Sequence, residues 1–289
     1  MTKVKIITDS NSGIHQNDCG DIFVIPMPFT INGDEYLEEV SISNEQFYNF
    51  LENNADVTTS QPSRFYLQEL FDDMLKEHDQ IVYIPMSSGL SGTCANALSL
   101  AGEYDGKVEV VDNLGISVTQ KCSVYEALAL SKQGKNAQEI KQHLENQKGL
   151  TSIYIVPTTL KYLKKGGRIT PAAAALASLL KIKPILSSSG KSFEKSAICL
   201  NLAQAKKKMI GLIKQDLAVK FKQIYDNGNV VLSVAHTNNE NEALRFKEEI
   251  MREIPNVEVR YVDQLSLSVS CHIGPGAIAI ALFTNEIKY

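Results

Sequence analysis

Short apolar runs alternate with helix-like segments along the first half of the chain, and this rhythm constrains the fold more than any other feature. Serine residues mark two helix starts, because Ser43 can cap a helix through Leu51 and Ser63 can cap the next one. The strand candidates are 4–7, 22–25, 81–85 and 108–111, and further helix candidates are 92–101, 117–132 and 137–147. The alternation predicts an α/β fold with a parallel sheet between two helical layers, a three-layer α/β/α unit.

The second half keeps the strands but carries longer helices. Its strand candidates are 152–156, 184–187, 230–235, 257–262 and 278–283, and its helix candidates are 158–165, 171–180, 201–225 and 239–253. Long helices between spaced strands predict a two-layer α/β unit with a mixed sheet. Because segment 147–150 is polar and contains glycine, we predict an N-terminal domain over 1–150 and a C-terminal domain over 151–289.

The charge distribution agrees with two units. The formal net charge is −4, but residues 1–150 carry −12 and residues 151–289 carry +8. Two readings stay open: domains whose opposite charges help to close their interface, or solvated surfaces that differ by chance. The small net charge argues against a dedicated nucleic-acid-binding protein.

Several other classes of protein are excluded by the same sequence. The longest apolar run, 277–283, is far shorter than the roughly 20 residues that a membrane-spanning helix needs. The N-terminus has no signal-peptide pattern, so we expect a cytoplasmic protein. The five cysteines are odd in number and lack any C-x-x-C spacing, which predicts neither a disulfide framework nor a zinc site.

Hydroxyl-rich loops follow two of the predicted strands. Segment 87–93, Ser-Ser-Gly-Leu-Ser-Gly-Thr, joins an apolar strand to a helix, and Thr8-Asp9-Ser10 ends the first strand. Ligands of parallel sheets bind beyond the carboxyl ends of the strands, and free N–H groups at a helix start attract anions. A second hydroxyl cluster, 58–63, precedes another helix. The alternative reading is a flexible turn and an ordinary helix cap.

Two further motifs combine glycine with a basic or imidazole side chain. Segment 272–277 contains G-x-G-x-x-A, but too few residues follow for a dinucleotide fold, so its glycines are expected to shape a turn that presents His272. Segment 161–169 is expected to form the basic C-terminal end of a helix that two glycines terminate, and Arg168 follows these glycines. Both motifs can equally be structural. A lone histidine usually has a structural role, and positively charged side chains stabilise the C-terminus of a helix.

Known catalytic signatures are missing. The chain has no P-loop, no H-E-x-x-H, and only an incomplete match to G-x-S-x-G around Ser91. An alternative function nevertheless stays open, a hydrolase or phosphate-ligand enzyme that uses Ser88 or Ser91 with His272. A nucleic-acid or regulatory module that uses the basic second half is a third hypothesis.

Taken in order, the motifs around Thr8-Asp9-Ser10, 59–63, 87–93, 167–169 and 272–276 resemble the DegV family, and the resemblance runs from residue 6 to 276. It implies a two-domain α/β protein that is not itself an enzyme. Such a protein binds a long-chain fatty acid such as palmitate, stearate or oleate, with the carboxylate at the domain interface and the tail in an apolar tunnel. It needs no cofactor or metal, and it presents the lipid to a separate ATP-dependent fatty acid kinase subunit. The acyl phosphate that this subunit makes feeds phospholipid synthesis.

The resemblance also assigns residues. It places the carboxylate-binding hydroxyls at Thr59 or Ser60 and at Ser88 or Ser91, with His272 near the head group and Arg168 at the pocket mouth or kinase interface. A histidine would supply a group able to become cationic. Candidates for the tunnel lining are 172–177, Leu179, Leu180 and Ile182, which read equally well as a plain buried helix. The simplest expectation is a monomer without nucleic acid, in at most transient contact with a membrane.

Overall fold

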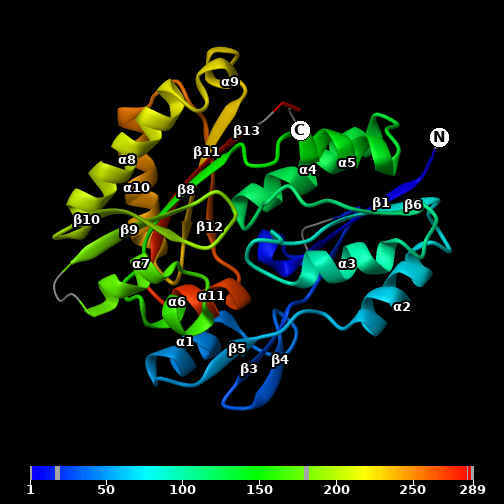
Figure 1. Cartoon of the computed structure of the whole chain (residues 1–289), viewed down its shortest axis with the longest axis horizontal. Coiled ribbons are helices and arrows are strands. Elements are labelled where there is room, and N and C mark those ends of the chain that lie inside the picture. Colours follow the sequence, from blue (N-terminus) through cyan, green and yellow to red (C-terminus); the bar gives the residue numbers. More distant parts are fainter. Residues whose placement is uncertain (1, 17–19, 179–181, 285, 288–289) are drawn as a thin grey trace.

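The computed structural model describes residues 2–16, 20–178, 182–284 and 286–287. Within these ranges the strands form two larger sheets and one small sheet, and the two larger sheets lie on opposite sides of Figure 1. The two-domain α/β architecture predicted from the sequence is confirmed. None of the helices within these ranges is long and apolar enough to cross a membrane.

The first sheet is parallel throughout, in the order β2-β1-β6-β7. Its strands are β1 (Val4–Asp9), β2 (Ile22–Ile25), β6 (Gln80–Ile84) and β7 (Val108–Val110). Its helices are α2 (Arg64–Met74), α3 (Thr93–Ala101), α4 (Val118–Lys132) and α5 (Ala137–Asn146). Neighbouring strand residues point to opposite faces: Ile6 and Val82 pack in one core with α4 and α5, and Ile7 and Tyr83 in another with α2 and α3. This is the predicted three-layer unit.

The second sheet has the order β10-β9-β8-β13-β11-β12 and is mixed, since only β11 and β12 pair in parallel. Its strands are β8 (Thr151–Val156), β9 (Lys183–Ser188), β10 (Glu194–Cys199), β11 (Val230–His236), β12 (Val259–Gln264) and β13 (Ile278–Thr284). One face packs against α8 (Leu202–Ala218) and α10 (Glu240–Glu253). The predicted helix 201–225 is in fact two, α8 and the short α9 (Lys222–Asp226).

The other face of the second sheet turns toward the first domain. It packs against α6 (Lys161–Gly166), α7 (Pro171–Ala174) and α11 (Leu267–Ile273) in a core that also takes in Val118 and Cys122 from α4. The predicted helix 171–180 is shorter than expected, because α7 passes into a 3₁₀ turn, η3 (Ala175–Ser178). The helix α11 was not predicted.

A small antiparallel sheet was also missed. It consists of β3 (Pro28–Ile31), β4 (Asp34–Leu37) and β5 (Val57–Thr59), and it packs with α1 (Asn44–Glu52). Phe29 and Tyr48 of this unit share a core with Tyr162 of α6 and Leu267 of α11. The division of the chain near residue 150 therefore stays a prediction, because residues 28–59 pack against elements of the second half.

Local capping follows the sequence closely. Ser43 forms a full capping box with Gln46, and the Ser63 hydroxyl accepts from the N–H of Tyr66, as predicted. These caps satisfy N–H groups that the first turn of a helix leaves without a partner. Both helix starts are thereby fixed beside the 58–63 loop and the small sheet.

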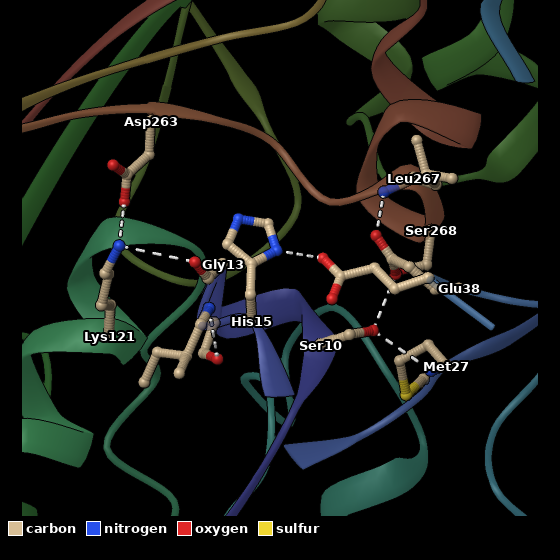
Figure 2. A network of polar contacts seen from close by, with 12 residues as sticks. Ser10, Gly13, His15, Met27, Glu38, Lys121, Asp263, Leu267 and Ser268 are labelled. Atoms are coloured by element: carbon tan, nitrogen blue, oxygen red, sulfur yellow. Dashed lines mark hydrogen bonds and ion pairs between the residues drawn. The ribbon is translucent and has the colours of Figure 1, made fainter. Parts of the chain in front are cut away.

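Ion pairs of both polarities join the two halves of the chain: in one the second half supplies the cation, and in another the first half does. Lys165 of α6 pairs with Asp56 beside β5, as attraction between a basic second half and an acidic first half predicts. Lys121 of α4 pairs with Asp263 of β12 at 2.7 Å, which is the reverse polarity (Figure 2). The ammonium group of Lys121 also lies 4.7 Å from the Tyr261 ring centroid. The ion pairs between the halves therefore do not follow a single polarity.

Candidate functional site

A cavity of about 330 Å³ lies where the two domains meet. This volume falls at the lower end of the range for small-molecule sites. Eight polar and eight apolar side chains line it together with Gly92, and most of the wall surface is apolar. The polar residues are Asn11, Thr59, Ser60, Gln61, Ser91, Arg168, Ser268 and His272; the apolar residues are Met27, Met86, Leu90, Ile116, Leu163, Phe193, Val269 and Ile273. Such a wall suits an amphipathic ligand.

The first domain supplies its share of the wall from the carboxyl ends of its parallel strands. Asn11 follows β1, Met27 follows β2, Met86 follows β6 and Ile116 follows β7. The site therefore lies at the sheet edge where ligands of open parallel sheets bind. The opposite wall comes from α6, α11, Arg168 after α6 and Phe193, which directly precedes β10.

The motif residue Asp9 organises this edge rather than lining it. Its buried carboxyl accepts from the N–H of Met86 at 2.9 Å, from Gln120 Nε2 at 3.0 Å and from both nitrogens of Asn11. Burial raises the pKa of Asp9, and these donors oppose the rise. Asp9 thus ties the loop after β1 to the loop after β6.

Thr59 and His272 meet in the cavity wall although 213 positions separate them. Thr59 Oγ1 lies 2.9 Å from His272 Nε2. His272 belongs to the last turn of α11, and Gly274 ends that helix at φ +78°. The segment at His272, which was expected to be a turn, is therefore the end of a helix.

The imidazole of His272 is held neutral. Burial, and then the nearby Arg168 guanidinium, lower its pKa to about 4. The expectation that His272 would supply the positive charge is wrong near pH 7, because a buried imidazole beside an arginine resists protonation. The permanent charge belongs to Arg168.

Arg168 bridges the two halves at the cavity. Its Nε donates to the carbonyl of Leu90 at 3.1 Å, and its Nη1 donates to the carbonyl of Gly166. Gly167 ends α6 in the left-handed region at φ +69°, as the predicted helix stop requires. The chain can therefore turn and bring Arg168 back over the helix end.

The two candidate serines of the 87–93 loop, Ser88 and Ser91, point in different directions. Ser91 lines the cavity, and its Oγ lies 2.9 Å from Thr93 Oγ1. Ser88 is exposed and is not among the lining residues, because its hydroxyl donates to Asp112 Oδ2 at 2.8 Å. Of the two, Ser91 is therefore the one placed to contact a ligand in the cavity. It also leaves Ser88 without the contact to His272 that the alternative enzyme hypothesis needs.

The apolar lining differs from the expected one. None of residues 172–177 is among the lining residues; Ala173 and Leu176 are buried in the adjoining core, while Ala172, Ala175 and Ala177 are exposed. Ile182 packs against the same core, and Leu179 and Leu180 lie outside the described residues. The apolar lining comes instead from Leu163, Phe193, the helix α11 and the strand-end loops.

Sequence reasoning missed Asn11, Gln61 and Ser268 as lining residues. Asn11 directly follows the Thr8-Asp9-Ser10 motif and Gln61 lies inside the 58–63 cluster, so proximity to a recognised motif was the available signal. For Ser268 the available signal was weaker: serines alternate at positions 266, 268 and 270. Within the described ranges, no group of three or more His, Cys, Asp or Glu side chains is placed to hold a metal ion.

Comparisons with known proteins agree with this architecture. The family described as "Uncharacterised protein, DegV family" matches residues 3–285. A DegV domain-containing protein of Staphylococcus aureus (strain N315) is 30% identical over 284 residues, which cover 98% of this chain and 99% of the relative. Protein DegV of Bacillus subtilis (strain 168) is 28% identical over 282 residues, covering 96% and 98%.

Solved structures are similar over the same extent. A DegV family protein from Thermus thermophilus, described by its fatty acid binding, superimposes with a TM-score of 0.86 at 25% identity and covers 98% of this chain and 99% of its own. DegV from Bacillus subtilis, described as a fatty acid binding protein, gives 0.84 at 27% identity, with 99% and 100% covered. From the match across the whole length and the shared two-domain fold, the chain belongs to the DegV family.

Proposed function

We propose that this protein binds one long-chain fatty acid, such as palmitate, stearate or oleate, in the cavity between its domains. Thr59, Ser60, Ser91 and His272 would hold the carboxylate, and the tail would lie against the apolar lining. The observation that carries the proposal is the composition of the cavity wall, which joins a cluster of hydroxyl groups to a continuous apolar core. The description of the Thermus thermophilus and Bacillus subtilis relatives as fatty acid binding supports it.

The chemistry of the head-group residues suits a carboxylate. Hydroxyl groups can rotate to point their hydrogen at the anion and donate a hydrogen bond to it. The Arg168 guanidinium supplies a positive charge at the same wall of the cavity. With its hydrogen on Nε2, the neutral His272 can donate to Thr59 Oγ1, which leaves the single Thr59 hydrogen for the carboxylate. Affinity would come mainly from the tail: about 14 methylenes at about 0.8 kcal/mol each give a gross gain on the order of 10 kcal/mol before costs.

We further propose that the protein hands its lipid to a separate ATP-dependent kinase subunit, which makes the acyl phosphate for phospholipid synthesis. The protein would act in the cytoplasm as a monomer and carry out no chemistry itself. Arg168 supports this division of labour, because it lines the cavity while it also bridges the two domains. A partner that docks over Arg168 would reach the head group without unfolding either domain.

Native mass spectrometry of the protein purified from a bacterial host tests the binding proposal. The expected result is a complex that carries one fatty acid, identified after extraction. A protein that carries no fatty acid, and that binds none after delipidation, would refute the proposal. The Ser88→Ala variant should retain the lipid, because Ser88 lies outside the cavity lining.

A further inference from the structure

A buried carboxyl group lies directly behind the polar wall of the cavity. Glu38, just past β4, is 3% exposed, and its oxygens contact three groups (Figure 2). Oε2 lies 2.7 Å from Ser10 Oγ and 3.0 Å from Ser268 Oγ, and Oε1 accepts from the N–H of Leu267. Because Ser268 lines the cavity, a single hydroxyl group separates Glu38 from the space for the ligand.

The hydrogens in this network can be counted. Asn11 Nδ2 donates to Asp9 Oδ1 at 2.9 Å, which fixes Asn11 Oδ1 as an acceptor. Ser268 Oγ lies 2.7 Å from that oxygen, and a hydroxyl has one hydrogen, so a bond to Asn11 leaves none for Glu38. The 3.0 Å contact between Ser268 and Glu38 is then a hydrogen bond only if Glu38 supplies the hydrogen, as a protonated carboxyl.

The surroundings of Glu38 favour the neutral acid. The titratable groups that face it are Glu39 on its own loop, Tyr48 from α1 and Cys271 from α11, and none of these carries a positive charge. Asp9 lies beyond Asn11 in the same network. Burial raises the pKa of Glu38 to about 7, against the opposing effect of its neutral donors. Near neutral pH the group is therefore poised between its two forms.

We propose that the proton on Glu38 turns Ser268 into a hydrogen-bond donor toward the cavity, so that a fatty-acid carboxylate binds together with one proton. An ionised Glu38 draws the Ser268 hydrogen to itself, and the hydroxyl then presents its lone pairs to the ligand. A protonated Glu38 donates to Ser268 Oγ and releases the Ser268 hydrogen for Asn11 or a ligand oxygen. The proton comes from the buffer and stays on Glu38 while the ligand is bound. This inference rests on the proposed function and makes Glu38 a positioning residue.

Calorimetric titration of the delipidated protein with oleate, in two buffers of different ionisation enthalpy, measures the proton directly. Above about pH 7 the wild type should take up close to one proton per oleate, and its affinity should fall about tenfold per pH unit. Glu38→Gln should show no uptake and no pH dependence, because an amide donates to Ser268 at every pH. Glu35→Gln, an exposed position on β4, is the matched control and should behave as the wild type.

Two results would overturn the proposal. One is a wild-type affinity that does not change with pH; the other is an uptake that survives in Glu38→Gln and vanishes in His272→Gln, which would assign the proton to the imidazole. If none of these proteins binds oleate, the proposed function fails. Infrared spectroscopy then still shows whether the Glu38 carboxyl group is protonated. A protonated-carboxyl band at about pH 6 in the wild type but not in Glu38→Gln supports the inference, and its absence from the wild type overturns it.

Discussion

Replacing Gly166 by alanine should push the head-group histidine out of place. A methyl group at Gly166 would lie 2.8 Å from His272 Cε1 and closer still to Nδ1, whereas ordinary contacts begin near 3.4 Å. The ring must therefore retreat by more than half an ångström, which breaks its 2.9 Å contact with Thr59. Overpacking costs about 1–3 kcal/mol and the lost hydrogen bond about 1 kcal/mol.

The neighbouring glycine provides a matched control. Gly167 has φ +69° and nothing within 4 Å of an added methyl group. Alanine there strains the backbone by about 1–2 kcal/mol but leaves His272 alone. By urea unfolding, Gly166→Ala should therefore lose about 2–4 kcal/mol and Gly167→Ala about 1–2 kcal/mol of stability. Only Gly166→Ala should lose affinity for oleate, by about thirtyfold for a loss of about 2 kcal/mol.

Displacement of a fluorescent fatty acid by oleate, measured on delipidated protein, gives the affinities. Equal affinity in the wild type and a folded Gly166→Ala variant would refute the role of His272 at the head group. Equal losses in both glycine variants would show that general destabilisation, rather than the position of the imidazole, controls binding.

Three further predictions concern single residues of the site. Ser91→Ala should weaken oleate binding about fivefold to tenfold, whereas Ser88→Ala should leave it unchanged in the same displacement assay; the reverse order would contradict the assignment of Ser91. Arg168→Ala should impair acyl-phosphate formation with a kinase subunit more than it impairs lipid retention, and equal loss of both would contradict that division. Burial raises the pKa of Glu38 from its ordinary 4.5 to about 7, so protonation favours the folded state and this stability is lost as the pH rises through that range. The free energy of unfolding of the wild type should therefore fall by about 3 kcal/mol relative to Glu38→Gln between those pH values; a constant difference in urea unfolding would contradict the shift.

Features that depend on local sequence could be predicted. The caps at Ser43 and Ser63 need only a hydroxyl before a helix, and the three-layer unit follows from short apolar strands separated by helices. The cavity edge was also predictable, because carboxyl ends of parallel strands meet at one edge whatever the details of the loops.

Features that depend on contacts between residues far apart in the sequence could not be predicted. The α11 segment is buried on almost every side, so it shows no amphipathic spacing that would mark a helix. The choice between Ser88 and Ser91 depends on which hydroxyl Asp112 engages. The role of Glu38 requires a contact with Ser268, 230 positions away, and its side chain looks like an ordinary surface carboxylate in the sequence.

A crystal structure of the protein with bound oleate tests the central claim most directly. The account predicts the carboxylate within hydrogen-bond distance of Thr59, Ser60 or Ser91, with the tail against Leu163 and Phe193. A ligand in the reverse orientation, or one bound outside the cavity between the domains, would contradict it.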